Sequence, residues 1–375
     1  MATLQFRAGA WFGSLLLAGT LAACGGGATP AGPSPAQASA VASAKPAPAS
    51  QRAASTAAVA SSAAAKPAGS AVASGKPQAS VPAIRLAYVA PVAPMLPVWM
   101  AAATKAFEKR GVNVTVRFIQ ANAAVPALIA KEVDALEISA APVITADVNG
   151  KADLVFVASM LNHATFMLTA KNGINSGADL KGKTVGSDRP ATPGAYGTQA
   201  ALGLLGLKTT DVTIRELGSA NVVLQAMLSG QLDSGTLGQP ESFESEGKGF
   251  HVLQDTFGIP YQNTGIVMLR SRLDQLAPAM PGVLLALRDG MQAFNQQPDL
   301  GMKVLQEYTK TSDQNILQKT YALHRDKAPF ELTLQPTLEG LKAMSATLGE
   351  TIPAAKTADP AQFVDGRFLK DLPKV

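Results

Sequence analysis

Hydrophobic and polar residues alternate along residues 81–375, and the period of the alternation changes repeatedly. Period-two stretches rich in β-branched and aromatic residues predict strands, whereas apolar residues spaced three or four apart predict helices. Strands are predicted at 84–89, 112–119, 135–138, 154–158, 164–170, 184–186, 212–217, 234–237, 251–253 and 266–269. Helices are predicted between them at 99–109, 125–131, 143–148, 196–205 and 222–228. This order predicts an α/β fold with largely parallel sheets covered on both faces.

The pattern beyond residue 272 is helical, with no strand of comparable strength. Helices are predicted there at 283–294, 301–309, 313–324 and 334–348. We therefore expect two α/β lobes joined by two crossover segments, one near Ala170 and one near Gly265. Lobe 1 is expected to comprise residues 81–170 and 266–375, including the helical C-terminal tail. Lobe 2 is expected to comprise residues 171–265.

The first 23 residues have the features of a secretory signal. Arg7 precedes an apolar run over 8–23 that Gly and Ser interrupt, and the run is short for a membrane span. The run ends in Leu-Ala-Ala followed by Cys24, which resembles the bacterial lipobox. The resemblance implies cleavage before Cys24 and attachment of a lipid to its sulfur. The alternative is a soluble secreted protein with a stray cysteine.

Residues 24–80 are of low complexity and are expected to be a disordered tether. Ala, Pro, Ser, Gly and Thr make up 46 of the 56 residues from 25 to 80. Val41, Val59 and Val72 are the only large apolar side chains in that stretch, so little apolar surface offsets the entropy of ordering. We therefore predict a lipid-anchored domain that a flexible tether holds on the extracytoplasmic side of a membrane.

Charge and cysteine content exclude several classes of protein. The net charge of +5 comes from five basic residues in 1–80, which contain no Asp or Glu, so residues 81–375 carry 27 Lys and Arg against 27 Asp and Glu. A nucleic-acid-binding domain would need a clustered basic surface. One cysteine excludes an intramolecular disulfide and a Cys-rich metal site. His163, His251 and His324 lie far apart, so we predict no metal and no cofactor.

One phosphate-binding motif is expected to be coincidental. Residues 177–184 satisfy G-x-x-x-x-G-K-[ST], but a P-loop leaves a strand and opens a helix. Here Ser176 and Asp179 resemble a capping box for a short helix, and Thr184 starts a predicted strand. We therefore do not predict nucleotide binding.

Four segments instead resemble a known family, the periplasmic solute-binding proteins of ABC importers. The class is the one that handles nitrate, sulfonates, taurine and thiamine-precursor pyrimidines. The segments, matched in order and spacing, are 109–114, 131–135, 179–186 and 228–240. Lys131 departs from the pattern, since glycine is usual there. The resemblance implies a periplasmic-binding-protein type II fold, a small anionic or polar organic solute held between the lobes and an ABC permease as partner. We also expect a monomer. We expect no enzymatic activity, because no acid–base or thiol constellation is visible and the one cysteine is assigned to the lipid.

Candidate ligand-binding residues lie at the predicted carboxyl ends of strands, where open α/β sheets bind their ligands. Tyr88 could stack on a ligand or belong to the core, and Ser139 could bind a polar group or only cap a helix. Arg189 could clamp an anionic ligand, or Asp188 could pair with it. The complete predicted set is Tyr88, Pro94, Ser139, Ala140, Asn162, Ser187, Arg189, Thr192, Tyr196, Gln239 and Asn263.

Three alternatives remain open from the sequence. A ligand-sensing lipoprotein would have the same sequence features as a transport protein. An enzyme on the same fold, of the pyrimidine-synthesis type, would need a poised acid–base or thiol group in the cleft. A structural surface lipoprotein would lack a ligand-sized gap between its lobes.

Overall fold

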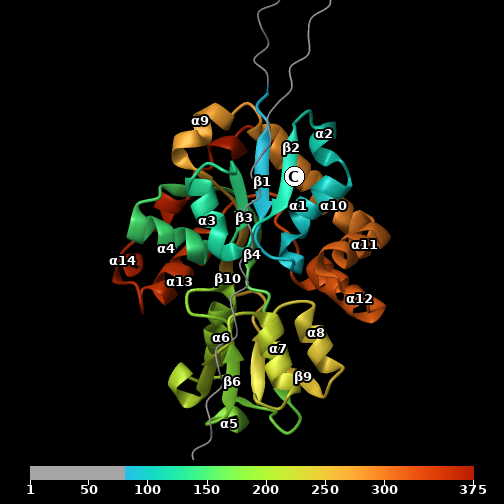
Figure 1. The fold of residues 1–375 in the computed structure, drawn as a ribbon, viewed down its shortest axis with the longest axis vertical. Coiled ribbons are helices and arrows are strands. Elements are labelled where there is room, and N and C mark those ends of the chain that lie inside the picture. Colours follow the sequence, from blue (N-terminus) through green and yellow to red (C-terminus); the bar gives the residue numbers. More distant parts are fainter. Residues whose placement is uncertain (1–80) are drawn as a thin grey trace, which may run out of the picture. The chain divides into compact units, whose positions relative to one another are not determined.

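The computed structural model describes residues 81–375, which form two five-stranded sheets with helices around each (Figure 1). The predicted signal peptide, the lipidation site Cys24 and the tether all lie outside the described residues. Within 81–375, no helix is both long enough and apolar enough to cross a membrane.

The first sheet has the strand order β2-β1-β3-β10-β4. Its strands are β1 (Ile84–Tyr88), β2 (Val114–Phe118), β3 (Ala135–Ile138), β4 (Leu154–His163) and β10 (Pro260–Leu269). β1 pairs in parallel with β2 and β3, whereas β10 is antiparallel to both β3 and β4. The sheet is therefore mixed, not largely parallel as predicted, because β10 returns from the other lobe and inserts between β3 and β4.

The second sheet repeats this plan with the order β7-β6-β8-β5-β9. Its strands are β5 (Met167–Lys171), β6 (Thr184–Ser187), β7 (Thr213–Glu216), β8 (Ser234–Leu237) and β9 (Phe250–Asp255). β6 pairs in parallel with β7 and β8, and β5 is antiparallel to β8 and β9.

The chain passes between the sheets twice, at residues 164–166 and 256–259. Ala170 lies inside β5 and Gly265 lies inside β10, so both crossings come a few residues before the predicted points. Thr256 fastens the two crossings together, because its amide and hydroxyl both donate to the Phe166 carbonyl and its hydroxyl accepts from the Phe166 amide. The two lobes of the predicted fold are thus present. The assignment of residues to signal peptide, tether and lobes stays a prediction.

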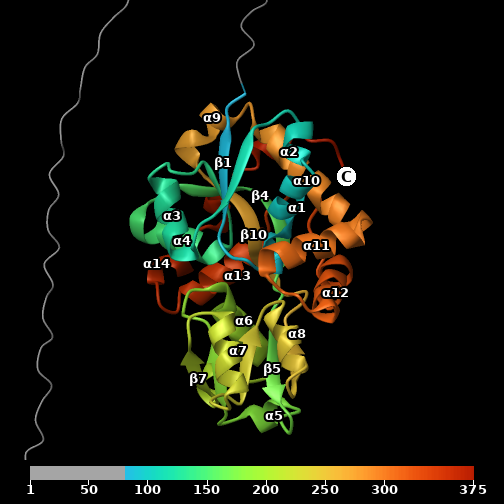
Figure 2. The same cartoon turned by 45° about the vertical axis from the view of Figure 1, so that its right-hand side comes forward.

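Two groups of helices lie on opposite sides of the first sheet (Figures 1 and 2). One group contains α1 (Leu96–Ala103), α2 (Ala106–Lys109), α10 (Met280–Gln296), α11 (Pro298–Thr309) and α12 (Gln314–Ala322). The other contains α3 (Ala121–Ile129), α4 (Ala140–Gly150), α13 (Leu338–Leu348) and α14 (Pro353–Lys356). α9 (Leu273–Leu276) follows β10. The helix predicted at 99–109 is two helices, since Lys105 adopts a left-handed backbone conformation (φ 54°).

The second sheet carries the four helices α5 (Gly177–Leu180), α6 (Pro193–Leu204), α7 (Ala220–Leu228) and α8 (Glu241–Glu246). α5 is the short helix predicted inside the false phosphate motif, and the Ser176 hydroxyl accepts from the Asp179 amide at 3.3 Å. Thr184 then begins β6, so the motif does not open a helix.

The C-terminal tail covers the outer edge of β4, which is otherwise an edge strand with free backbone groups. Backbone bonds join Ser159 to Leu334, Met160 to Glu331 and Phe156 to Asp365. This cover explains why β4 is a buried apolar run although it ends the sheet.

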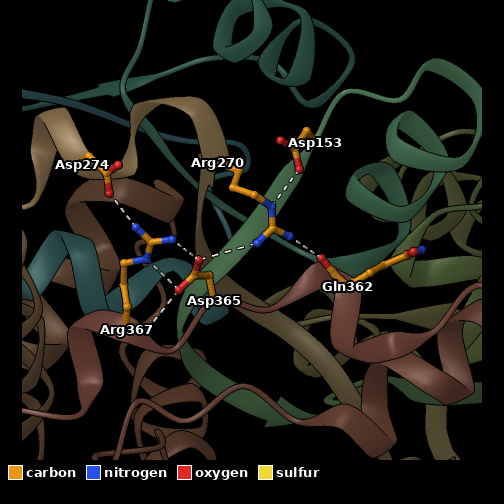
Figure 3. Close-up of polar contacts among 6 residues, drawn as sticks. All are labelled: Asp153, Arg270, Asp274, Gln362, Asp365 and Arg367. Carbon is orange, nitrogen blue, oxygen red and sulfur yellow. Dashed lines mark hydrogen bonds and ion pairs between the residues drawn. The ribbon is translucent and has the colours of Figure 1, made fainter.

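Ion pairs fasten the last part of the tail to the segment that follows β10 (Figure 3). Arg270 donates to Asp153 at 2.8 Å and to the Gln362 carbonyl at 2.8 Å, and its guanidinium lies 3.5 Å from Asp365. Arg367 bridges Asp365 at 2.9 Å and Asp274 at 2.7 Å. The two arginines hold the pKa of the Asp365 carboxyl below its usual range, against the effect of burial.

Candidate functional site

The parallel strands of the two sheets point their carboxyl ends toward the region between the lobes. In Figure 1, β1 points toward the second sheet and β6 points toward the first. The segments that follow these ends hold Pro94, Ser139, Arg189, Thr192 and Gln239. The fold therefore brings together, at one level of the molecule, most of the residues predicted to bind ligand.

A pocket of about 90 Å³ lies between α6 of the second lobe and α13 of the tail. We call it the interlobe pocket. It is lined by Ser187, Asp188, Pro190, Ala191, Thr192, Ala195, Tyr196, Thr198, Gln199, Ile214, Glu216, Met344, Thr347, Leu348, Glu350 and Thr351. Three of the predicted residues, Ser187, Thr192 and Tyr196, line it. The α13 residues were not predicted, because nothing in the sequence brings position 344 next to position 196.

The N-terminus of α6 is complemented from within the chain. Thr192 is the N-cap, and its hydroxyl accepts from the Ala195 amide at 3.3 Å. Asp188 lies against the first turn, since a Cβ placed on Gly194 would be 2.7 Å from the Asp188 Cβ. A carboxylate thus occupies the positive end of the helix, where the sequence suggested that an anionic ligand would bind.

Asp188 and Arg189 do not form an ion pair in the structure. Asp188 accepts instead from the Arg189 backbone amide at 3.0 Å, and burial raises the pKa of the Asp188 carboxyl. Arg189 is exposed and lies beside Gly218, outside the lining of the interlobe pocket. A role for Arg189 in anion binding stays a prediction.

Tyr196 links the second lobe to β10. Its ring stacks on Tyr261 with centroids 4.7 Å apart, and its hydroxyl donates to the Pro260 carbonyl at 3.1 Å. The Tyr261 hydroxyl is fully buried and lies beside the Ser139 side chain, with no hydrogen bond of regular geometry in the described part of the chain. Burial raises the pKa of the Tyr261 phenol. Ser139, the N-cap of α4 that makes no capping bond, is therefore close to the Tyr196–Tyr261 stack.

The other predicted residues at the crossings make hydrogen bonds within the protein. Gln239 donates to the Thr165 carbonyl at 2.8 Å, and Asn263 donates to the His163 carbonyl at 3.0 Å. Asn162 donates to the Gln335 carbonyl at 2.8 Å. The Pro94 carbonyl accepts from Thr264 at 3.3 Å, and Ala140 is the buried first residue of α4. These contacts fasten the crossings, and ligand binding by these residues stays a prediction.

Tyr88 ends β1 within an aromatic cluster of four residues. Its ring centroid lies 5.5 Å from Trp99, 5.9 Å from Tyr308 and 5.5 Å from Phe118. Trp99 is fully buried and stacks on Tyr308 with centroids 4.5 Å apart. Tyr88 and Tyr308 are half-buried and Phe118 is exposed, so part of the cluster faces solvent.

Two buried glutamates near the strand ends were missed by sequence reasoning. Neither oxygen of Glu137 in β3 has a hydrogen-bond partner in 81–375, and burial raises the pKa of its carboxyl well above the usual range. Glu241 at the start of α8 is 7% exposed, and burial raises its pKa as well. The available signal was a charged residue inside the apolar strand 135–138 and another directly after Gln239 and Pro240.

The polar character of the site is acidic. Asp188, Glu216 and Glu350 line the interlobe pocket, and no Lys, Arg or His is among its lining residues. In residues 81–375, no three His, Cys, Asp or Glu side chains are grouped closely enough to hold a metal ion. The arrangement offers hydrogen-bond acceptors and negative charge to a small solute.

Two histidines adjoin the first crossing. His163 ends β4, and His324 lies in the π-helical turn Leu323–Lys327 that follows α12, where it stacks on Phe330 with centroids 5.4 Å apart. His324 is fully buried, and burial together with the nearby His163 lowers its pKa to about 3. The His324 ring is therefore a neutral packing element of the tail at ordinary pH, and burial lowers the pKa of His163 in β4 as well.

Residues 94–300 match the family model described as NMT1/THI5 like. No curated protein matches the chain by sequence.

Several solved structures share the fold. The periplasmic aliphatic sulphonate binding protein SsuA from Escherichia coli is 20% identical, with a TM-score of 0.64 over 76% of this chain and 92% of that one. The ligand-binding component of an ABC-type import system from Staphylococcus aureus is 14% identical, with a TM-score of 0.61 over 78% and 99%. The desulfurization enzyme DSZB is 13% identical, with a TM-score of 0.58 over 76% and 97%. These likenesses confirm the predicted periplasmic-binding-protein fold.

Proposed function

Because the chain belongs to the NMT1/THI5-like family, whose model matches more than half of it, we propose that it is a solute-binding protein of an ABC importer. It captures a small polar organic solute between its two lobes and delivers it to a membrane permease. The observation that carries the proposal is the interlobe pocket, which α6 of the second lobe and α13 of the tail build together. A pocket with walls from both lobes couples ligand binding to their relative position.

Closure about the two crossings provides the mechanism. The lobes are joined only by 164–166 and 256–259 along the backbone, and a ligand that touches both favours the closed arrangement. Polar contacts already reach across: Gln199 of α6 lies 3.5 Å from the Glu350 carboxylate, and Lys319 of α12 binds Glu246 of α8 at 2.6 Å. A permease would then select the closed, loaded form.

The proposed location is the extracytoplasmic face of a membrane, with Cys24 lipidated after cleavage of residues 1–23. The lipobox-like sequence supports this, and a monomer suffices because both walls of the pocket come from one chain. Metabolic labelling with a fatty acid tests the anchor. We expect label in the wild type and none in Cys24→Ala, and equal labelling of both would contradict it.

A thermal-shift screen of the full chain tests binding. The panel contains alkanesulfonates, nitrate, carboxylates, pyrimidines and amines, since a ligand that binds only the folded state raises the melting temperature by mass action. Small-angle scattering then measures closure, which we expect as a smaller radius of gyration with ligand. Stabilisation without compaction would contradict capture between the lobes.

An enzyme on the same fold is the alternative, since the desulfurization enzyme shares it. Mass spectrometry of the ligand recovered after long incubation distinguishes the two. A binding protein returns the ligand unchanged, whereas conversion to a product would identify an enzyme.

A further inference from the structure

A glutamate near the carboxyl edge of the first sheet has no partner that explains it. Glu137 is the third of four residues in β3, is 0% exposed, and neither of its oxygens is hydrogen-bonded in the described part of the chain. Burying a carboxyl group without hydrogen bonds costs stability, so an apolar side chain would serve the core better. A group from outside the chain that binds the Glu137 carboxylate would offset this cost.

The sheet register places this carboxyl group beside the aromatic cluster. Tyr88 pairs with Glu137 across neighbouring parallel strands, so both side chains project from the same face. Phe118 pairs with Tyr88 on the other side, and that face is the one covered by Trp99 of α1 and Tyr308 of α11. The indole N–H of Trp99 is buried and also lacks a partner within 81–375. Two unpartnered groups thus flank Tyr88.

This combination has a definite chemical preference. The faces of Trp and Tyr rings attract a cation, and a buried carboxylate neutralises its charge. An anion would meet the Glu137 carboxylate with nothing basic beside it. A neutral apolar solute would leave the carboxyl group unpaired.

We propose that the solute is an organic cation, whose ammonium group is held by the Glu137 carboxylate and the ring faces of Tyr88 and Trp99. This deepens the proposed function and rests on it. Tyr308 lies at the penultimate residue of α11, is half-buried and stacks directly on Trp99, so admission of the ammonium group to the Trp99 ring requires Tyr308 to move aside.

The raised pKa of Glu137 adds a signature that a structural glutamate would not give. Burial raises the pKa of the Glu137 carboxyl well above its usual range in the empty protein and so favours a bound proton, whereas a bound ammonium group favours the carboxylate. Binding therefore releases a proton to solvent, and affinity rises with pH until Glu137 is ionised in the empty protein.

The experiment uses the full chain with a set of probes that differ in charge. The cations are methylammonium, tetramethylammonium and choline; the neutral probe is 3,3-dimethyl-1-butanol, an uncharged analogue of choline; the anion is ethanesulfonate. Melting temperature reports binding. Trp99 emission reports the place of binding in a Trp11→Phe background, since Trp11 and Trp99 are the two tryptophans.

We expect at least one cation to raise the melting temperature and change Trp99 emission, with 3,3-dimethyl-1-butanol at least tenfold weaker than choline. Glu137→Gln, which keeps the shape of the side chain, should weaken the cation at least tenfold and abolish proton release in calorimetry with two buffers. The control Glu132→Gln changes an exposed glutamate of the same lobe and should leave both unchanged. Tyr308→Ala, which uncovers Trp99, should accelerate binding.

Three results would overturn the inference. Stabilisation by ethanesulfonate with none by the cations would reject the cation and leave the solute-binding function standing. Equal cation affinity in Glu137→Gln and the parent would reject the assigned residue. No response to any of these probes, or to the panel proposed above, would reject both the inference and the function.

Discussion

Tyr196 and Tyr261 stack face to face across the lobe junction, but their hydroxyl groups differ in environment. The Tyr196 hydroxyl donates to the Pro260 carbonyl, whereas the Tyr261 hydroxyl is buried and makes no hydrogen bond of regular geometry in the described residues. One stack thus joins a satisfied polar group and an unsatisfied one. The unsatisfied hydroxyl lies near Ser139, at the N-terminus of α4.

This difference predicts opposite effects of the same substitution. Tyr196→Phe should lower the free energy of unfolding by about 1 kcal/mol, the net value of one hydrogen bond. Tyr261→Phe should leave the free energy of unfolding unchanged or raise it, because it removes a buried hydroxyl that makes no hydrogen bond of regular geometry. Urea denaturation of the two variants measures both. A larger loss in Tyr261→Phe than in Tyr196→Phe would contradict the assignment.

His324 predicts that acid weakens the fold. Its pKa is about 3 in the folded protein and near 6.5 when unfolded, so below pH 6.5 the unfolded state binds a proton that the folded state excludes. Above pH 6.5 the group has no effect. Between pH 6.5 and 3, His324 lowers the free energy of unfolding by up to about 1.4 kcal/mol for each pH unit of acidification.

Urea denaturation of the parent and of His324→Phe at several pH values isolates this contribution. Phe keeps a ring against Phe330 but cannot be protonated, so the parent should lose stability faster than the variant as the pH falls. Parallel curves for the two proteins would show that His324 does not carry the effect.

The ion pairs of Asp365 predict that removing its charge lowers the free energy of unfolding. Asp365 accepts from Arg367 and lies near Arg270, and its side chain is 13% exposed. Asp365→Asn should lower the free energy of unfolding by about 1.5–3 kcal/mol, the value of hydrogen bonds to charged groups. The control is Asp326→Asn, which breaks the exposed pair with Arg325 and should have no measurable effect. Equal losses in the two variants would contradict the role of burial.

Gly290 of α10 lies so close to α1 that the structure leaves no room for a side chain there. A Cβ there would lie 2.6 Å from the Ala101 backbone nitrogen, so Gly290→Ala should push α10 from α1 and cost about 1–3 kcal/mol. Gly203 in α6 has no atom within 4 Å of its Cβ position, so Gly203→Ala should stabilise by about 0.5–1 kcal/mol. Thermal denaturation compares them, and a stabilised Gly290→Ala would refute the close contact.

Much of the fold could be predicted from local sequence patterns. The strands at 84–89 and 135–138 and the short helix before Thr184 were placed nearly as the structure has them, because alternation and capping are properties of neighbouring residues. The same local patterns excluded a nucleotide-binding loop at Gly182 and Thr184. The helix at 99–109 was predicted without its break, since nothing in the local pattern marks Lys105 as left-handed.

The sequence by itself determined the two α/β lobes, the family resemblance and the candidate loops, because each depends on residues close together along the chain. Only the tertiary structure decided that α13 forms a wall of the interlobe pocket, that Asp188 occupies the end of α6, and that Glu137 lies beside Tyr88. Those relations join residues 49 to 150 positions apart or depend on side-chain direction. Burial, register and charge at such distances are set by packing, and local patterns do not encode them.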